Sequence, residues 1–505
     1  MAPLPFNLVL PLVILPVLYL VALVLYRLYL HPLANFPGRK LHAISAVPCA
    51  YSMVKGRLPF KNRLLHEKHG SVIRITPNEL SFNTAQAWVD IYGFKPAGHT
   101  QLLRDPIHIG SMDPLKGVYP MTLLNGAEHG RQRRAWSYAF SDRSLRESEE
   151  QVQAHVVKLI NHLRQREGDE VNLARWLSMT TFEIIGDLTF AEPFGCLGED
   201  NDESWYKLNY ATFRMAALEQ ATRRLAEVNS WRQWCLMALI PHSWRQLRFD
   251  HLAYSRDKVL RRLEKEEEPE RADFIECTLK HQDRFDLNDT EIIVNGATFI
   301  AAGSETLSNL LSGLVAQLLY NPAKCEKLRH EIRSSFTKSE EINHDQTITL
   351  PYLNACIEEA LRLKPPVGEG LLRRVPKEGA TIDGYSIPGG TSVSVDPWAA
   401  SHNEGNFRDC DDFVPERWLA DKEHYFAGDK RKAAQPFSLG PQGCLGKQLA
   451  YMEMRLIMCH LLWNFNIKST DGAWQWDSAG QMKNLRIYVV WEKPPLNVRL
   501  KSVTT

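Results

Sequence analysis

The chain begins with a long apolar segment. From Leu8 to Tyr26 no residue is charged, and the positions are mostly leucine, valine, isoleucine and aromatic residues. At about 1.5 Å of rise per residue, a helix over this segment approaches the roughly 30 Å thickness of a bilayer's hydrocarbon core. The pattern predicts one transmembrane helix, and residues 1–30 are expected to form an N-terminal membrane anchor.

The charges around this segment predict its orientation. A cleaved signal peptide is the alternative, but residues 1–7 carry no basic side chain, whereas Arg27, Arg39 and Lys40 follow the segment. By the positive-inside rule the rest of the chain faces the cytosol, which indicates a single-pass protein of the endoplasmic reticulum membrane. Prolines and a glycine make residues 31–40 a stiff hinge.

A long helix is predicted from Asn288 to about Tyr320. Asn288 is a good N-cap, Glu291 stands where a capping box needs it, and Pro322 follows the end of the segment. Apolar residues cover more than one face, as in a helix that crosses a core. Gly303 lies in the middle, where glycine costs about 1 kcal/mol relative to alanine, so a specific reason for it is expected.

Most of the remaining chain has helical periodicity, including Tyr352 to Leu363, and strand signals are few. They lie from Ser71 to Ile75 and between Ile382 and Val395. The predicted fold class is therefore α+β, predominantly helical, with small peripheral β-sheets. No linker, low-complexity run or repeat divides residues 41–505, which we interpret as one large domain.

Composition narrows the classes of function. The formal net charge is +1, so no basic surface for nucleic acid is expected. The nine cysteines are odd in number, scattered and without C-x-x-C spacing. They indicate a reduced protein on the cytosolic side and not a disulfide framework.

One cysteine lies in a distinctive setting. Cys444 has two glycines nearby, in a loop from Phe437 to Gly446, and a helix is predicted from Leu445 to about Trp463. Glycines let backbone N–H groups approach the sulfur, and the positive end of the helix favours a thiolate. A thiolate placed there is suited to bind a metal, and a buried structural cysteine is the alternative.

This loop resembles the haem-binding signature of the cytochrome P450 family, Phe-x-x-Gly-x-Arg-x-Cys-x-Gly. Phe437, Gly440, Cys444 and Gly446 match it, and Gln442 stands in place of the usual arginine. The resemblance implies the cytochrome P450 fold and a haem b cofactor, with the Cys444 thiolate as axial ligand of the iron and the other loop residues around the haem. Other segments resemble microsomal fungal members, especially the isotrichodermin C-15 hydroxylase-like group of secondary metabolism.

Within the long predicted helix, Gly303, Glu305 and Thr306 match the family's Ala/Gly-Gly-x-Asp/Glu-Thr pattern. The match implies a catalytic role, in which Gly303 leaves room for O2 and the acid and the alcohol deliver protons to it. A salt-bridged glutamate and a back-bonded threonine are the structural alternative. Leu307 replaces a hydroxyl residue that the family often has.

Haem carries two propionates, which need positive or hydrogen-bonding partners. His129 and Arg133, four residues apart on a predicted helix face, and Arg373 match the family's propionate contacts. Because Gln442 carries no charge, we expect His129, Arg133 and Arg373 to contribute more to haem binding than they usually do.

A separate set of charges matches the family's structural lock behind the haem. Glu359 and Arg362 share a predicted helix face, and Arg417 lies in a Pro-Glu-Arg-Trp motif. A solvated ion pair of little energetic value is the alternative. The resemblance assigns these residues to folding and haem retention and not to chemistry.

These resemblances imply a haem-thiolate monooxygenase that inserts one O2-derived oxygen atom into a lipophilic small molecule, such as a fungal terpenoid or polyketide. Oxidative coupling, desaturation or rearrangement at the same haem is one alternative, and a non-catalytic haem-binding protein is an alternative of another class. By family geometry the pocket is lined from residues 107–124, 211–238, 299–302 and 367–372, which are mostly apolar.

No G-x-G-x-x-G fingerprint follows a predicted strand, so the electrons must come from a separate protein. The resemblance implies NADPH–cytochrome P450 reductase, or cytochrome b5, as this partner. Lys430, Arg431, Lys432 and Lys447 flank the cysteine loop and form a candidate docking patch for an acidic surface. A solvated run of charges explains the same residues equally well.

Overall fold

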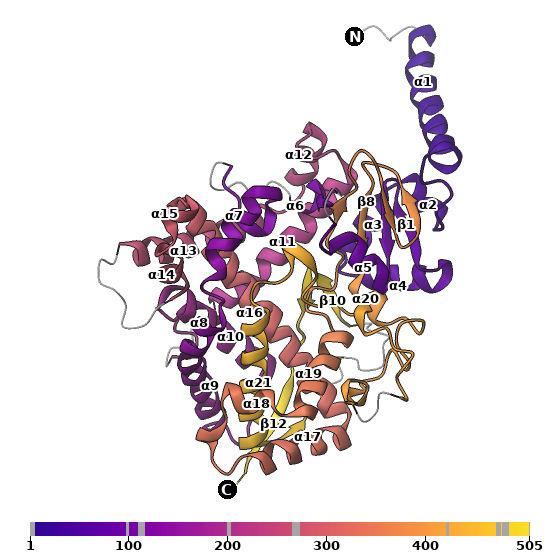
Figure 1. Cartoon of the computed structure of the whole chain (residues 1–505). Coiled ribbons are helices and arrows are strands. Elements are labelled where there is room, and N and C mark those ends of the chain that lie inside the picture. Colours follow the sequence, from indigo (N-terminus) through magenta and orange to yellow (C-terminus); the bar gives the residue numbers. More distant parts are fainter. Residues whose placement is uncertain are drawn as a thin grey trace.

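Helices form most of the molecule, and small sheets complete it (Figure 1). The computed structural model describes residues 6–96, 100–109, 117–198, 204–264, 273–420, 424–470, 476 and 484–503. The prediction of an α+β, predominantly helical fold with small sheets is confirmed.

The helices are α1 (Phe6–Leu25), α2 (Lys40–Ile44), α3 (Val47–Val54), α4 (Leu58–His69), α5 (Ala85–Tyr92), α6 (Pro106–Ile109), α7 (Gly126–Ser137), α8 (Asp142–Glu147), α9 (Glu149–Arg164), α10 (Leu173–Phe190), α11 (Ser204–Leu225), α12 (Trp231–Ala238), α13 (His242–Leu263), α14 (Phe274–Leu279), α15 (Gln282–Phe285), α16 (Asp289–Tyr320), α17 (Pro322–Ser335), α18 (His344–Ile348), α19 (Pro351–Leu363), α20 (Pro397–Ser401) and α21 (Lys447–Asn464). The strands are β1 (Val72–Thr76), β2 (Glu79–Phe82), β3 (Leu103–Arg104), β4 (Glu170–Asn172), β5 (Arg373–Arg374), β6 (Ala380–Ile382), β7 (Tyr385–Ile387), β8 (Ser392–Val395), β9 (Phe465–Ser469), β10 (Arg486–Tyr488), β11 (Val490–Glu492) and β12 (Asn497–Ser502).

The largest sheet has five strands in the order β1-β2-β8-β5-β3. The strand β5 pairs antiparallel with both β8 and β3, and in the second pairing Arg104 lies opposite Arg373. Residues opposite each other on neighbouring antiparallel strands have Cβ atoms roughly 5 Å apart. This register therefore brings two arginines that are distant in the sequence to one end of the sheet.

The helix α16 runs through the core, as predicted. The Glu291 N–H donates to Asn288 Oδ1 at 2.9 Å, and the Asn288 N–H donates to Glu291 Oε2 at 3.1 Å, so the capping box is confirmed. Pro322 lies in the first turn of α17, where its missing N–H is harmless. Most of α16 is buried, and it packs along α10. The centre of α16 is thereby fixed inside the molecule.

The apolar N-terminal segment forms α1, which projects from the body of the molecule (Figure 1). Over the part of the chain that the structure describes, no helix combines the length and the apolar character needed to cross a membrane. The prediction of a transmembrane helix is therefore not supported. In the hinge that follows, Leu33 is fully buried and Phe36 packs against the same apolar cluster, so the hinge is held on the main body.

Candidate active site

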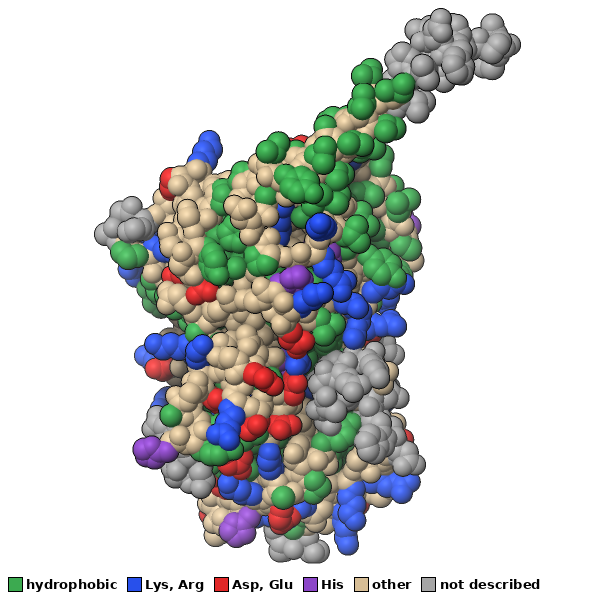
Figure 2. Space-filling model, turned by 90° about the vertical axis from the view of Figure 1, so that its right-hand side faces the viewer, with side chains coloured by type: hydrophobic (Ala, Val, Ile, Leu, Met, Phe, Trp, Pro, Cys, Tyr) green, Lys and Arg blue, Asp and Glu red, His purple; other side chains and the backbone are tan. Residues whose placement is uncertain are grey.

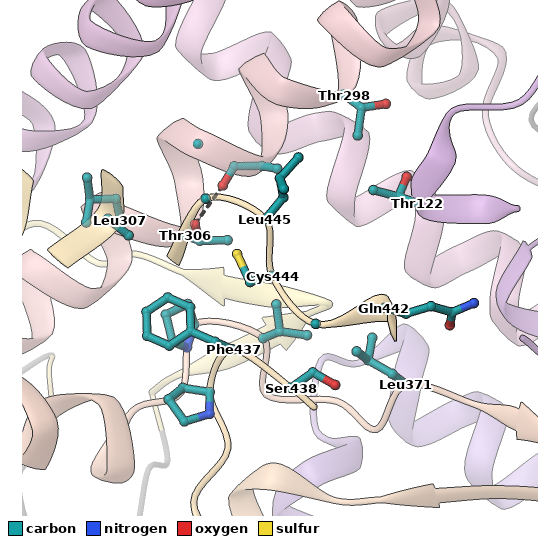
Figure 3. Close-up of a pocket in the computed structure, with 18 of the residues that line it drawn as sticks. Thr122, Thr298, Thr306, Leu307, Leu371, Phe437, Ser438, Gln442, Cys444 and Leu445 are labelled. Carbon is teal, nitrogen blue, oxygen red and sulfur yellow. Dashed lines mark hydrogen bonds between the residues drawn. The ribbon is translucent and has the colours of Figure 1, made fainter. Parts of the chain in front are cut away.

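Cys444 lies in a tight loop before α21. Its backbone N–H donates to the Phe437 carbonyl at 2.8 Å, which closes the loop. Gly440 has a φ of +67°, and a Cβ there would lie 2.1 Å from the Tyr92 carbonyl oxygen, so this position requires glycine. Phe437, Cys444 and Gly446 all line one cavity (Figure 3). The loop geometry thus presents the sulfur to an interior space.

The Cys444 thiol is exposed to this cavity although it lies deep in the protein. Burial raises the pKa of the thiol, and this outweighs a backbone hydrogen bond at Gly446 and the charges of Arg133 and Lys447, which lower it. Burial thus favours the neutral thiol. A metal ion bound to the sulfur would favour the thiolate, because metal ligation displaces the thiol proton.

The cavity has a volume of about 420 Å³ and lies between the Cys444 loop and α16. Residues from the predicted segments 107–124, 299–302 and 367–372 line it, whereas no described residue of 211–238 does. Most of the lining side chains are apolar. A cavity of this size with few polar groups is typical of small-molecule sites.

Three basic side chains, Arg104, His129 and Arg133, line the cavity, and Arg373 lies close enough to Arg104 and His129 to lower their pKa values. Burial, with the nearby Arg373 and Arg133, lowers the pKa of Arg104 to about 9. Burial and the three arginines lower the pKa of His129 to about 4. Nε and Nη1 of Arg373 and Nε of Arg104 have no hydrogen-bond partner among the described residues. Such mutually repelling, unsatisfied donors fit the two propionates of a haem.

The helix α7 and the sheet position this set. His129 and Arg133 lie one turn apart on α7, and Arg133 also donates to the Gly443 carbonyl at 2.7 Å. No motif in the sequence points to Arg104. It lies in a two-residue strand, and only the pairing with β5, which depends on distant segments, brings it to the site.

Gln442 lies beside these residues but makes only weak hydrogen-bond contacts. Its amide nitrogen is 3.4 Å from Asn125 Oδ1, a long contact, and its Oε1 has no partner among the described residues. Asn125 Oδ1 also accepts from the Arg104 N–H at 2.8 Å. Gln442 carries no charge, whereas the side chain of Arg104, from another part of the chain, lines the same cavity.

The predicted catalytic residues on α16 differ in whether they line the cavity. Gly303 and Thr306 line the cavity, and the sulfur of Cys444 points toward Thr306 (Figure 3). The Thr306 hydroxyl donates to the Ala302 carbonyl at 2.6 Å, as in the back-bonded alternative. A Cβ on Gly303 would lie 2.7 Å from Ile185 on α10. Close packing of α10 on α16 therefore explains this glycine without invoking room for O2.

Glu305 does not line the cavity. Its side chain is only 2% exposed, and Lys493 donates to Glu305 Oε2 at 2.6 Å and to the Ser308 hydroxyl at 2.7 Å. The structure thus realises the salt-bridged alternative for Glu305. The expected pair of an acid and an alcohol side by side at the cavity is not formed, because the carboxylate is bound to Lys493 and does not line the cavity.

The predicted lock residues come together in the core. Glu359 binds Arg362 at 2.8 Å and Arg417 at 3.0 Å, and all three side chains are fully buried. Trp418 Nε1 donates to the same carboxylate at 2.9 Å, and Asp429 binds Arg417 at 2.5 Å. Burial alone would raise the pKa of Glu359, but Arg362 and Arg417 hold it below the usual value. The network is buried and fully paired, unlike a solvated ion pair.

Comparison with known proteins agrees with this geometry. The family model described as "Cytochrome P450" matches residues 100–497. Cytochrome P450 monooxygenase aba2 of Botryotinia fuckeliana is 41% identical over 96% of this chain and 93% of its own length. ABA2 of Pyricularia oryzae is 40% identical over 95% and 93% of the two chains. Cytochrome P450 monooxygenase astA of Talaromyces wortmannii is 38% identical over 96% of each.

Proposed function

The chain belongs to the cytochrome P450 family, and on that premise we propose that it oxidises a lipophilic small molecule of fungal secondary metabolism, such as a terpenoid or a polyketide. It is a cytochrome P450 monooxygenase, with a haem-thiolate cofactor and O2 as co-substrate. The proposed reaction is R–H + O2 + NADPH + H+ → R–OH + H2O + NADP+, or the corresponding epoxidation of an alkene. The observation that supports it most is the Cys444 thiol opening onto an apolar cavity with a cationic edge.

In this proposal the haem supplies O2 activation and passes on the electrons. The side chains of Arg104, Arg133 and Arg373 would bind its propionates, and the Cys444 thiolate would bind its iron. The Thr306 hydroxyl lies on the cavity side of α16, where it donates and accepts protons during O2 reduction. The Glu305 carboxylate joins this relay only when its ion pair with Lys493 opens.

We also propose that NADPH–cytochrome P450 reductase supplies the electrons. Lys430, Lys432 and Lys447 are exposed on both sides of the cysteine loop in the sequence, whereas Arg431 donates to the Arg417 carbonyl at 2.5 Å. Exposed cations close to the buried sulfur favour docking of an acidic surface near the haem. Charge reversal at the three lysines is expected to slow reduction, and the slowing is expected to depend on ionic strength.

A further proposal concerns the location of the protein, which we place at the endoplasmic reticulum membrane with residues 41–505 in the cytosol. Figure 2 shows apolar side chains along residues 14–25 of α1 and around its base. Exposed examples are Leu15, Tyr19, Tyr29 and Leu30. Exposing apolar side chains of a helix to water is unfavourable, so a membrane or a partner is expected to cover them. Removal of residues 1–30 is expected to release the protein from the membrane pellet. A truncated protein that stays in the pellet would contradict the proposal that these residues hold the protein at the membrane.

Product analysis tests the proposed reaction. Cells that express the chain with a fungal NADPH–cytochrome P450 reductase are fed candidate terpenoids and polyketides, and products are identified by mass. A gain of one oxygen atom from labelled O2 supports the proposal. A loss of two hydrogens, or a joining of two molecules, supports desaturation or coupling at the same haem. NADPH-independent haem binding without any product supports the non-catalytic alternative.

A further inference from the structure

One stripe of the helix α16 faces the cavity. Thr298, Ala302 and Thr306 follow one another at intervals of four residues, so they lie on one face of the helix, and all three line the cavity. Between Glu291 and Ile300 only Thr298 is partly exposed, whereas its neighbours on the helix are buried. The Thr298 side chain therefore faces the interior space, as Thr306 does.

A second threonine lies beside Thr298. Thr122 belongs to a short helical turn, Met121–Leu123, and all three residues of this turn line the cavity. The Met121 N–H donates to Asn295 Oδ1 at 2.9 Å, and the fully buried Asn295 lies about one turn before Thr298 on α16. This hydrogen bond holds the turn against the helix, and Figure 3 shows the two threonines as neighbours.

The two hydroxyl groups differ in the hydrogen bonds that they can offer to a ligand. The Thr298 hydroxyl donates to the Val294 carbonyl at 2.8 Å, so its oxygen can only accept a further hydrogen bond. The Thr122 hydroxyl has no partner among the described residues, so it can donate as well as accept. Its oxygen is not among the enclosed, unpartnered side-chain atoms of the protein, so it is open to the cavity that the residue lines. A ligand in the cavity can therefore reach both side chains.

This combination favours one kind of polar group. A ligand hydroxyl can accept a hydrogen bond from Thr122 and donate one to Thr298, so it pairs with both side chains. A ketone or an ether oxygen only accepts, and it leaves the Thr298 oxygen without a donor. Most of the other lining side chains are apolar, so the rest of the ligand is expected to be hydrocarbon.

We propose that Thr122 and Thr298 bind one hydroxyl group of the substrate, Thr122 donating to its oxygen and Thr298 accepting its hydrogen. The inference rests on the proposed monooxygenase function and deepens it by naming the substrate class: lipophilic alcohols. Apolar lining alone discriminates weakly among hydrocarbons, whereas polar groups placed for a hydroxyl reject analogues that lack it. Thr122 and Thr298 are therefore specificity-determining residues.

The position of this pair predicts which part of the substrate is oxidised. Thr298 precedes Thr306 by eight residues, which is about 12 Å along an α-helix. The Cys444 sulfur points toward Thr306 (Figure 3), so a hydroxyl bound at Thr298 lies on the order of 10 Å from the reacting carbon. The enzyme therefore oxidises a remote second position and not the alcohol carbon. The preceding step must be one that leaves an alcohol, such as hydration of an alkene, hydrolysis of a prenyl diphosphate or an earlier hydroxylation.

The test measures ligand binding to purified holoenzyme by the shift of its Soret band. The probes are farnesol, geranylgeraniol and 1-dodecanol, each compared with its own methyl ether, which has nearly the same shape but no donor. At least one alcohol is expected to bind about ten-fold more tightly than its ether. In Thr298→Val, which keeps the shape but removes the acceptor, the ratio is expected to fall to about two. In the double variant Thr122→Val/Thr298→Val it should fall to about one, whereas Thr298→Ser should retain it.

The matched control is Thr278→Val. Thr278 also donates its hydroxyl to the carbonyl one turn earlier, that of Phe274 at 2.9 Å, but it is not among the residues that line the cavity. The inference is overturned if no alcohol exceeds its ether, if the preference survives in the double variant, or if the best-bound alcohol is oxidised at the carbon that bears its hydroxyl.

The reduced, CO-bound spectrum of every variant separates this result from the proposed function. A normal thiolate-type spectrum without alcohol preference removes only the inference on Thr122 and Thr298. The absence of that spectrum in the parent protein removes the monooxygenase proposal itself.

Discussion

Lys493 binds Glu305 at 2.6 Å and thereby holds the carboxylate away from the cavity that its neighbour Thr306 lines. Both partners are largely buried, with side-chain exposures of 11% and 2%. Lys493 follows β11, far from α16 in the sequence, so the C-terminal part of the chain sets the position of the Glu305 carboxylate.

The first prediction concerns the strength of this pair. Lys493→Met leaves a buried carboxylate without its cation and is expected to destabilise the protein by about 3 kcal/mol. Glu305→Gln together with Lys493→Met removes both charges and should recover most of the loss. Urea unfolding of the three variants gives the coupling energy. Additive effects of the two substitutions would show that the ion pair does not hold Glu305.

A second prediction concerns Arg104, which takes part in a cluster of like charges. Arg104→Gln removes a propionate partner, so haem affinity is expected to fall by about ten-fold, as for one charge-assisted hydrogen bond. The same change should stabilise the haem-free protein, because repulsion from Arg133 and Arg373 is relieved. Transfer of haem to apomyoglobin measures the first effect, and urea unfolding after haem removal measures the second. Arg134→Gln, at an exposed position on α7, is the control; equal haem loss in both variants would contradict the assignment.

The buried network of Glu359, Arg362 and Arg417 is expected to lose much of its stabilising effect when one of these residues is replaced. Arg417→Leu leaves Glu359 and Asp429 without a shared cation in the core and should cost about 3–5 kcal/mol. Little holoprotein is then expected at 37 °C, whereas Arg417→Lys should retain some because it keeps the charge. Haem content per protein chain is the measurement. Full haem content in Arg417→Leu would show that the network does not stabilise the haem-bound fold.

The pH dependence of stability follows from Glu369, a buried acid whose Oε1 makes no hydrogen bond to any described residue. Its pKa is about 7 in the folded protein against an ordinary 4.5, so the folded state holds this proton more tightly. The stabilisation is complete below pH 4.5 and is lost as the pH rises through 7. Without ligand, Glu369→Gln should therefore equal the parent protein near pH 4.5 and exceed its stability at pH 8 by up to about 3 kcal/mol. Asp396, whose pKa burial also raises to about 7, is present in both proteins, and its charge raises the pKa of Glu369, so the two carboxyl groups titrate together in the parent protein. A pH-independent difference would argue against a buried, unpaired acid.

Most of the fold was predictable from local signals in the sequence. The capping box of Asn288 and Glu291 and the stop at Pro322 are set by neighbouring residues, so α16 was predictable at both ends. The glycine pattern around Cys444 likewise depends on backbone geometry within a few residues. These features need no knowledge of distant segments.

Three features of the site depend on distant segments and were not predictable. Arg104 reaches the cavity through strand pairing with Arg373, and Glu305 turns away because Lys493 lies behind it. Burial raises the pKa of the Cys444 thiol more than the Gly446 backbone hydrogen bond, Arg133 and Lys447 lower it. Each is a balance of tertiary contacts that no sequence motif records.

The central claim, that Cys444 is the haem ligand, is tested most directly by the CO difference spectrum of the reduced protein. The parent protein is expected to show the red-shifted Soret band of thiolate-ligated haem. Cys444→Ser is expected to lose that band, with haem still bound when Arg104, Arg133 and Arg373 are intact. A parent protein that lacks the band, or a Cys444→Ser variant that keeps it, would contradict the claim.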